Sequence, residues 1–467
     1  MASAKAFLLI PVENQVRELD AKLLLACVAA KRGLSSIIGS KRYVDDRIAS
    51  FPRSIYIAKS LLHGHRKLFR TARKLGHEIV AWDEDALVHL PAATYYSRRL
   101  SSASLACVSQ LFAWGEDNAE LWRRYPELPS AIPIHVTGNP RNDLLRSEIQ
   151  PYYQDEVDAI RRTHGDFILV NTNFNHVNSF SPIRRLFLES DAPGAPAKPG
   201  RASRGMSRDY AEGLRNHKQS IFDHFQEMIP ALEKKFPDQT IMVRPHPVES
   251  HEVYQQIARK CKRVQVSNKG NVVPWLMACK AVVLNGCTTS VEAYAMGVPA
   301  ISYRAVVNET YDDGFYRLPN LLSRQCFDFR ELCQTLRNIL DGKLGAADGE
   351  ERKALAKHHL AAMDGPLACE RIVDVVEKMA VRLPQAPKPA LTDRIAGWCK
   401  ATKRLVWRRS KSQDAGEHKS MEHHLKKNPE ISVSDLQGRI AKFKKLLGNG
   451  GDIGLERINA KIFRING

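Results

Sequence analysis

One segment, residues 282–293, joins an apolar run to a tight turn and then to a group of hydroxyl side chains. Its sequence predicts a buried strand, a turn at Gly286 and a helix directly after the turn. The polar positions that follow Gly286 are Thr288, Thr289, Ser290 and Glu292. A helix N-terminus offers unpaired N–H groups and a positive dipole end, so this segment can bind a phosphate. The Glu292 carboxylate can then accept hydrogen bonds from a ribose diol. Ordinary capping, with one threonine as N-cap and the glutamate completing a capping box, is the alternative.

A second segment places Arg244-Pro245-His246-Pro247 directly after the predicted strand 240–243. The two prolines restrict the backbone on both sides of the histidine. At the carboxyl end of a sheet strand, an arginine and an imidazole can pair with a diphosphate or with a departing phosphate. A simple turn is the alternative.

Acidic and amide side chains follow other predicted strands. Asp83, Glu84 and Asp85 come after the strand 77–82, where a carboxylate can act as general base on a sugar hydroxyl; a solvated acidic loop is the alternative. Asn173 lies in an asparagine-rich stretch after the strand 167–171 and offers a neutral hydrogen-bond partner. The turn 137–143, with the sequence TGNPRND, is the last strand-to-helix turn of the first half, and turn chemistry alone can explain it.

The elements that position these residues alternate between short apolar runs and longer segments of helical period, which is typical of stacked βα units around parallel sheets. We therefore predict an α/β fold with two Rossmann-like domains facing a cleft, followed by a basic helical extension. The predicted divisions are 1–148 for the acceptor domain, 149–384 for the nucleotide-binding domain and 385–467 for the extension. The Pro- and Gly-rich residues 192–207 predict a loop.

The charge is concentrated near the C-terminus. The 467-residue chain has a net charge of +19, and residues 386–467, with 18 Lys/Arg and 8 Asp/Glu, account for +10 of it. Residues 391–411 combine apolar positions at helical spacing with many Lys and Arg residues and two tryptophans, which predicts an anchor for an anionic membrane surface. A helix packed on the body of the protein is the alternative. Residues 433–447 and 455–463 predict two further small helices.

Composition excludes several classes of protein. The nine cysteines are scattered and never spaced as CxxC, which argues against a disulfide framework and a zinc site. No apolar run is long enough to cross a bilayer, and the N-terminal apolar run is too short for a signal peptide. No Asp-x-Asp pair stands where it could hold a metal-bound diphosphate. We therefore expect a cytoplasmic protein, peripheral at the inner face of the plasma membrane, with no metal and no cofactor.

The motifs together resemble a known family. The blocks PVENQVRELDAKLLLA, WDEDALVHL, QLFAWGEDNAELW, VTGNPRNDLL, VRPHPVES and CTTSVEA resemble the bacterial surface carbohydrate biosynthesis proteins, which are GT-B-type glycosyltransferases. The resemblance extends to capsule, Kdo and sialyl transferases that use CMP-sugars. It implies that His246 contacts the donor phosphate with Arg244 nearby, and that Glu84 or Asp85 is the base. Ala86 stands where those relatives have glycine, and a Thr-Thr pair replaces their paired serines.

By the same resemblance, Thr288, Thr289 and Ser290 bind phosphate and Glu292 binds the ribose or base side. The implied reaction transfers a sugar, Kdo-like or sialic-like from a CMP donor, to a lipid-linked or growing glycan. Two alternatives remain. A UDP-sugar 2-epimerase has the same fold and a similar TGN-x-x-x-D turn, but its paired-Gly, paired-Glu helix start is absent here. A nucleic-acid-binding protein would use the basic tail, yet no RNA- or DNA-binding module is recognisable and we expect no nucleic-acid partner.

Overall fold

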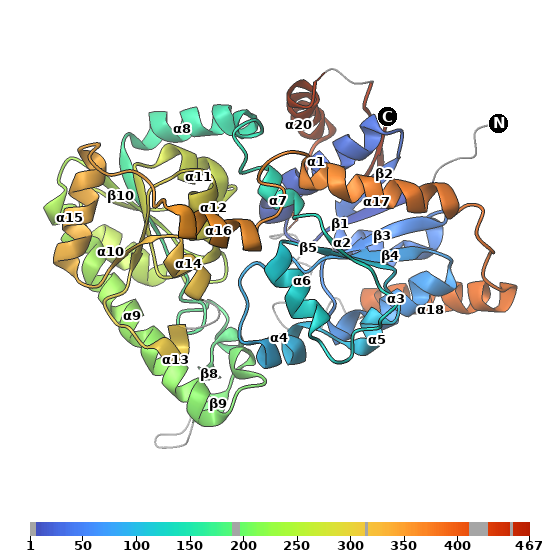
Figure 1. Ribbon diagram of the computed structural model, residues 1–467, viewed down its shortest axis with the longest axis horizontal. Helices are drawn as coiled ribbons and strands as arrows, with labels where there is room; N and C mark the ends of the chain where they lie inside the picture. Colours follow the sequence, from blue (N-terminus) through green and yellow to red (C-terminus); the bar gives the residue numbers. More distant parts are fainter. Residues whose placement is uncertain (1–5, 189–196, 313–315, 411–427, 449–451) are drawn as a thin grey trace. The chain divides into compact units, whose positions relative to one another are not determined.

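The chain forms two α/β units, each built around its own sheet (Figure 1). The computed structural model describes residues 6–188, 197–312, 316–410, 428–448 and 452–467. The first unit combines Met1–Leu87, Arg99–Tyr152 and Lys357–Gly467, and the second combines Val88–Arg98 with Tyr153–Ala356. The structure therefore divides the chain differently from the predicted boundaries: residues 357–467 belong to the first unit rather than to a second domain and a separate extension.

The first unit contains an eight-stranded sheet with the order β15-β16-β2-β1-β3-β4-β5-β6. Its six parallel strands are β1 (Phe7–Val12), β2 (Ser36–Ser40), β3 (Ser54–Ala58), β4 (Glu78–Ala81), β5 (Gln110–Ala113) and β6 (Ile134–Val136). Its longer helices are α1 (Gln15–Lys31), α3 (Arg66–Lys74), α6 (Glu116–Arg123), α17 (Ala368–Arg382), α18 (Leu391–Ser410) and α20 (Val433–Leu446). Shorter helices are α2 (Lys41–Asp46), α5 (Ser102–Leu105) and α7 (Pro140–Asp143). The central strands β1, β2 and β3 are almost entirely buried, as expected for parallel strands covered by helices on both faces.

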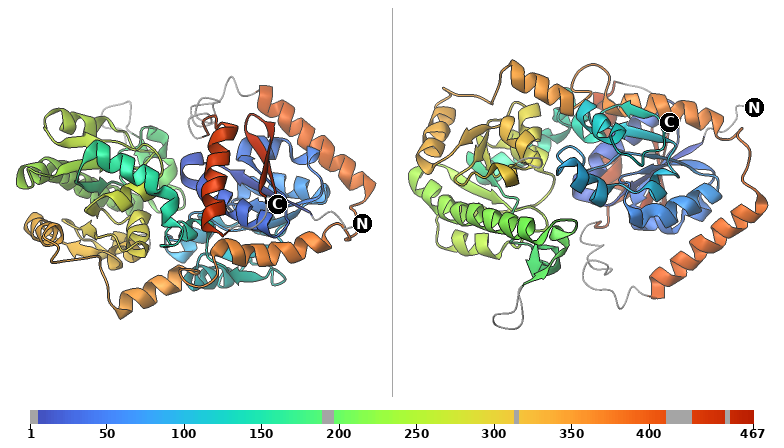
Figure 2. Two further views of the ribbon diagram at one scale, coloured as in Figure 1. Left: turned by 90° about the horizontal axis from the view of Figure 1, so that it is seen from above. Right: turned by 60° about the horizontal axis from the view of Figure 1, so that its bottom comes forward.

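The end of the chain completes the first sheet, which corrects one prediction. Residues 455–463 are not helical: β15 (Gly454–Asn459) and β16 (Ile462–Asn466) form an antiparallel hairpin, and β16 pairs with β2. Figure 2 shows this hairpin in dark red at the edge of the sheet. Gly39 permits the pairing, because a side chain there would meet the carbonyl oxygen of Lys461. The predicted helix 433–447 is confirmed as α20.

The second unit contains a six-stranded, fully parallel sheet with the order β11-β10-β7-β12-β13-β14. The strands are β7 (Phe167–Asn171), β10 (Thr240–Arg244), β11 (Val264–Val266), β12 (Ala281–Leu284), β13 (Ala300–Tyr303) and β14 (Arg324–Cys326). Counted in chain order this is the 3-2-1-4-5-6 arrangement of a Rossmann fold. The fold class predicted from the sequence is therefore confirmed for both units, whereas the cleft stays a prediction.

The long helix α9 (Arg208–Lys235) buries an apolar stripe against the sheet of the second unit. Phe225, Ile229 and Leu232 of α9 are packed in one cluster with strand residues such as Val170 and Val243. The other helices are α8 (Gln154–His164), α10 (Glu252–Arg259), α11 (Val272–Ala278), α12 (Thr288–Ala295), α13 (Glu309–Asp312), α14 (Arg317–Leu321) and α15 (Phe329–Leu340). Helices α4 (Ala92–Arg99) and α16 (Glu350–His359) cross the unit boundaries.

The segment predicted as a loop, 192–207, is partly regular. Residues 192–196 lie outside the described residues. In the remainder, β9 (Lys198–Pro199) pairs with β8 (Phe187–Leu188), and a short 3-10 turn, Arg201–Ser203, follows. The hairpin forms because Leu186 and Phe187 bury their side chains in a small cluster with residues at the start of α9.

Candidate active site

The topological switch point of the second sheet lies between β7 and β12, which are adjacent and pair Asn171 with Leu284. In sheets of this order, ligands bind outside the carboxyl ends of the strands at the switch point. The segments 171–176 and 285–290 follow these two strands, and the RPHP segment follows the neighbouring strand β10. The structure thus brings the predicted binding residues of the second half to one sheet edge.

Amide side chains connect the two segments at the switch point. The side-chain N–H of Asn171 donates to Thr289 Oγ1 at 2.9 Å and to Cys287 Sγ at 3.3 Å. Asn285 Oδ1 accepts from the backbone N–H of Asn173 at 3.1 Å. These bonds join β7 to the turn after β12, so Asn173 is held by its backbone at the position predicted for a ligand contact.

The turn at Gly286 requires glycine. Its φ of +69° is in the left-handed region, and a Cβ there would lie 2.6 Å from Tyr316 Cδ1 and 3.2 Å from Asn320 Oδ1. The close approach of the Tyr316 ring therefore depends on the missing side chain, and it brings the N-cap residue of α14 against the turn.

Helix α12 does not have the capping arrangement that was the alternative to phosphate binding. Its N-cap is Cys287 rather than a threonine, and the Cys287 side chain makes no capping hydrogen bond. Ser290 is turned inward, with its hydroxyl donating to the carbonyl of Cys287 at 2.8 Å. Thr288 is half-buried at the first position of the helix, while Thr289 and Glu292 are buried. The backbone N–H of Ser290 donates to the Cys287 carbonyl, and the first turn of α12 presents the backbone N–H and the hydroxyl of Thr288 where an anion can bind.

Arg244 and His246 have different surroundings. The buried guanidinium of Arg244 donates to the carbonyls of Lys269 and Gly270 at 2.9 and 2.6 Å and lies over the Trp275 ring. Burial lowers the pKa of Arg244 to about 10. This arginine fixes the loop after β11, so its predicted contact with the donor phosphate stays a prediction.

His246 is half-buried, and its Nδ1 accepts from the backbone N–H of Val248 at 3.4 Å. In the neutral imidazole the proton is then on Nε2, the nitrogen that can donate to a ligand. Its backbone N–H donates to Glu249 Oε1 at 3.2 Å. The RPHP segment is therefore positioned by a carboxylate that follows it.

Glu249 is buried and accepts several hydrogen bonds. Thr172 donates to both carboxylate oxygens at 3.0 and 3.1 Å, and the Tyr254 hydroxyl donates to Oε2 at 2.5 Å. Burial raises the pKa of Glu249, against the lowering effect of these donors. Sequence reasoning missed Glu249 and Thr172. The sequence signal for Glu249 was a single acidic residue two positions after Pro247. Acidic residues at such positions are also common in exposed turns.

The three acidic candidates, Asp83, Glu84 and Asp85, belong to the first unit and follow β4. Asp83 is fully buried and forms an ion pair with Arg99. Asp85 pairs with Arg17 and Arg99, both at 3.1 Å, and has a half-exposed side chain. Desolvation alone would raise the pKa of Asp85, but the two guanidinium groups outweigh it and lower the pKa.

Glu84 is 3% exposed, so the predicted alternative of a solvated acidic loop is wrong for it and for Asp83. Its Oε1 accepts from the Trp82 indole N–H at 2.8 Å and lies 3.7 Å from Lys22 Nζ. Its Oε2 is buried with no hydrogen-bond partner among the described residues. Asp85 is the most accessible of the three carboxylates.

The TGNPRND turn has a structural explanation within the first unit. Asp143 is buried and accepts from the backbone N–H groups of Ala368 and Cys369 at 2.7 and 2.8 Å, at the first turn of α17. Burial raises the pKa of Asp143 to about 6. This aspartate supplies the hydrogen-bond acceptors at the N-terminus of a helix more than 200 residues further along the chain.

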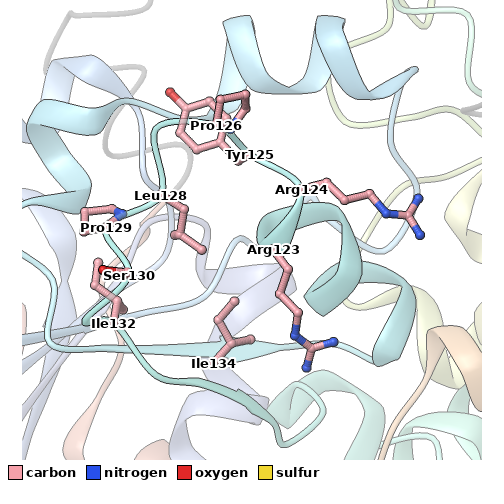
Figure 3. Close-up of a pocket in the computed structure, with 9 residues that line it drawn as sticks. All are labelled: Arg123, Arg124, Tyr125, Pro126, Leu128, Pro129, Ser130, Ile132 and Ile134. Carbon is pink, nitrogen blue, oxygen red and sulfur yellow. The ribbon is translucent and has the colours of Figure 1, made fainter.

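A hollow of about 530 Å³ in the first unit does not contain the predicted residues (Figure 3). Arg123, Tyr125 and Ile134 contribute to its lining, and Ile134 is the first residue of β6. The hollow is thus at the amino end of that strand, opposite the edge where ligands bind in such sheets. Within the described ranges, no group of three His, Cys, Asp or Glu side chains could hold a metal ion.

Solved structures of other proteins have a similar fold. The chain is similar to the wall teichoic acid polymerase TagF in a structure with CDPG, at a TM-score of 0.51 and 12% identity, over 82% of this chain and 90% of that one. UDP-GlcNAc 2-epimerases also match over 80% of this chain. Those from Methanocaldococcus jannaschii (12% identity, 99% of that chain) and Neisseria meningitidis (11%, 100%) both have a TM-score of 0.44.

At such low identity the likeness to TagF establishes the fold. No protein-family model matches the sequence, and no curated protein is significantly similar to it.

Proposed function

We propose that the chain is a nucleotide-sugar glycosyltransferase of bacterial surface-polysaccharide biosynthesis. The observation that supports this most strongly is the switch point of the second sheet. There a glycine turn and the N-terminus of α12, whose N-cap residue Cys287 makes no side-chain capping bond, lie at the same edge as the His246 imidazole. The fold shared with the teichoic acid polymerase is consistent with this proposal.

In the proposed reaction the acceptor hydroxyl attacks the anomeric carbon, the bond to the donor phosphate breaks, and the phosphate leaves with the electron pair. His246 and the first turn of α12, with Thr288, Thr289 and Ser290, offset the charge on that phosphate. Glu292 and Asn173 contact the nucleoside. Asp85 is the preferred base because its side chain is accessible, with Glu84 and Asp83 buried beside it. The reaction uses no metal or other cofactor.

The donor we propose is a CMP-activated sugar of the Kdo or sialic type, and the acceptor is a lipid-linked or growing glycan. A thermal-shift series with CMP, CDP, UDP and GDP tests the nucleotide, because a ligand stabilises the form that binds it. We expect CMP to give the largest shift. The shift should nearly disappear in His246→Ala, since a charge-assisted hydrogen bond contributes about 2 kcal/mol. His224→Ala, exposed on α9, is the control.

Two outcomes would contradict the proposal. His246→Ala could bind every nucleotide as tightly as the wild type, which would show that the second unit does not contain the proposed donor site. Alternatively, the wild-type protein alone could convert UDP-N-acetylglucosamine to its epimer, which would identify a 2-epimerase.

We also propose that α18 attaches the first unit to an anionic membrane surface. The helix packs on α2 and α3, where a Cβ at Gly397 would lie 3.1 Å from Leu75 Cγ, and Ala401 is buried. Ile395, Trp398 and Val406, on another face, are each more than half exposed. None of the described helices meets the length and hydropathy required of a membrane span. A basic helix with an exposed apolar stripe and tryptophans is suited to the membrane interface.

Sedimentation with vesicles tests this attachment. We expect binding to phosphatidylglycerol vesicles, weak binding to phosphatidylcholine vesicles, and at least a tenfold loss for the double variant Ile395→Glu/Trp398→Glu. Val381→Glu, a similarly exposed position on α17, is the matched control. Equal binding by the double variant and the wild type would refute the role of α18. Lys411, the last residue of the predicted anchor, lies outside the described residues.

A further inference from the structure

Helix α9 has a lysine on its buried side. Leu214, Lys218, Phe222 and Phe225 follow one another at helical spacing, and all four are buried. Lys218 is 4% exposed, and no described residue accepts a hydrogen bond from it or forms an ion pair with it. Burying an ammonium group without an anionic partner is costly, so such groups are rare outside functional sites.

Lys218 is close to the Gly286 turn through a shared neighbour. Its Nζ lies over the Tyr316 ring, 4.9 Å from the centroid. The same ring would be 2.6 Å from a Cβ at Gly286. Lys218 and the turn that begins α12 therefore both lie against Tyr316.

The acids nearest to Lys218 are already engaged by other donors. Asp312 accepts from His217 Nε2 and from Arg304 Nη2, both at 2.8 Å. Glu249 accepts from Thr172, Tyr254 and the backbone of His246. The negative charges of these two carboxylates raise the pKa of Lys218, although neither carboxylate forms an ion pair with it.

His176 lies within electrostatic range of Lys218 and of two further groups that can be cationic, Arg98 and His246. His176, from the segment after β7, has a buried Nδ1 with no hydrogen-bond partner among the described residues. Burial lowers the pKa of His176, and the positive charges of Lys218, Arg98 and His246 lower it further. Lys218 on α9 and His246 in the loop after β10 thus both lower the pKa of His176. Lys218, His176 and His246 can all be cationic, and neither of the two acids that act on Lys218 forms an ion pair with it, which favours an anion site here.

We propose that Lys218 is a phosphate-binding residue of the donor site, with its ammonium group donating to phosphate oxygens held between His246, His176 and the Gly286 turn. The inference rests on the proposed function, because it takes the phosphate of the nucleotide-sugar as the ligand. Its sequence signal is a lysine on the apolar stripe of an amphipathic helix.

Binding at this site is coupled to proton uptake. Burial lowers the pKa of Lys218 to about 7, so about nine-tenths of the free protein has the neutral amine at pH 8. A bound phosphate favours the ammonium form and raises this pKa. The groups that face the amine are Glu249, Asp312, Tyr316 and His176; the acids favour its charge, and a protonated His176 would oppose it. Each phosphate bound at pH 8 should then take up about 0.9 proton from the buffer.

Titration calorimetry at pH 8 in two buffers of different ionisation enthalpy measures both affinity and proton uptake. The probes are the nucleotide with the largest thermal shift and inorganic pyrophosphate. We expect Lys218→Met to lose at least tenfold in affinity for both and to lose most of the proton uptake. Lys234→Met, at an exposed position of the same helix, should match the wild type. Melting temperatures of both variants establish that they are folded.

The outcomes separate this inference from the proposed function. If the wild type binds a nucleotide and Lys218→Met binds it equally with the same proton uptake, the role of Lys218 is overturned and the proposed function stands. If the wild type binds pyrophosphate with Lys218-dependent proton uptake but binds no nucleotide, the anion site stands and the proposed function falls. If it binds neither, both are overturned.

Discussion

Replacing Lys218 by methionine should stabilise the protein near neutral pH. The variant keeps a flexible side chain of similar length and removes the ammonium group from a site where 4% of the residue is exposed. In the folded protein, burial lowers the pKa of Lys218 from its ordinary 10.5 to about 7. A residue that binds phosphate is expected to reduce stability in the absence of phosphate, whereas an ordinary structural lysine is not.

The sign and size of the effect follow from linkage. Between the folded and the unfolded pKa, the unfolded chain holds a proton that the folded chain has lost, so wild-type stability rises with pH across about pH 7 to 10. One pKa unit corresponds to about 1.4 kcal/mol, which makes the lysine cost about 4 kcal/mol at pH 7.5 and about 1 kcal/mol at pH 9.5. Because the folded protein has mostly the neutral amine above pH 7, the contact with the Tyr316 ring adds no cation–π energy to offset this cost. Lys218→Met should therefore be more stable than the wild type by about 4 kcal/mol at pH 7.5 and by about 1 kcal/mol at pH 9.5.

Urea unfolding of both proteins at half-unit steps from pH 7 to 9.5 measures this difference, with Lys234→Met as the control. The transition of the second unit is the relevant one, because Lys218 belongs to it. A variant that is less stable than the wild type at pH 7.5, or a difference that does not change with pH, would refute the reasoning. Either result would mean that the ammonium group has a stabilising partner in the folded state.

Two further substitutions test how distant segments are joined in the first unit. Asp143→Ala should lower the free energy of unfolding by about 2 kcal/mol, because α17 loses the acceptor for two backbone N–H groups; unchanged urea denaturation would contradict this. Gly39→Val should displace β16, since its Cβ would meet the backbone at Lys461, and should expose the last 15 or so residues to limited proteolysis. Gly64→Ala, with open space around its Cα, should be digested like the wild type.

The local pattern of the chain predicted the strands and helices that position the candidate site. Apolar runs such as 167–171 and 281–284 are strands in the structure because a parallel sheet buries both faces of its strands. The RPHP segment and the Gly286 turn follow these strands in sequence, so their place at the carboxyl edge could be inferred. The hairpin 454–466 could not, because its partner β2 is more than 400 residues away and its alternation is short.

The sequence by itself determined the fold class and the order of chemical groups along each strand-to-helix turn, because periodicity and turn residues are local properties. The tertiary structure alone decided the surroundings of those groups. It buried Glu84 and paired Asp85 with arginines, and it turned Ser290 inward. It also left Lys218 in a site where no described residue accepts its hydrogen bonds. Desolvation and ion pairing depend on groups brought together from distant parts of the chain, and these two effects set the charge and pKa of each candidate.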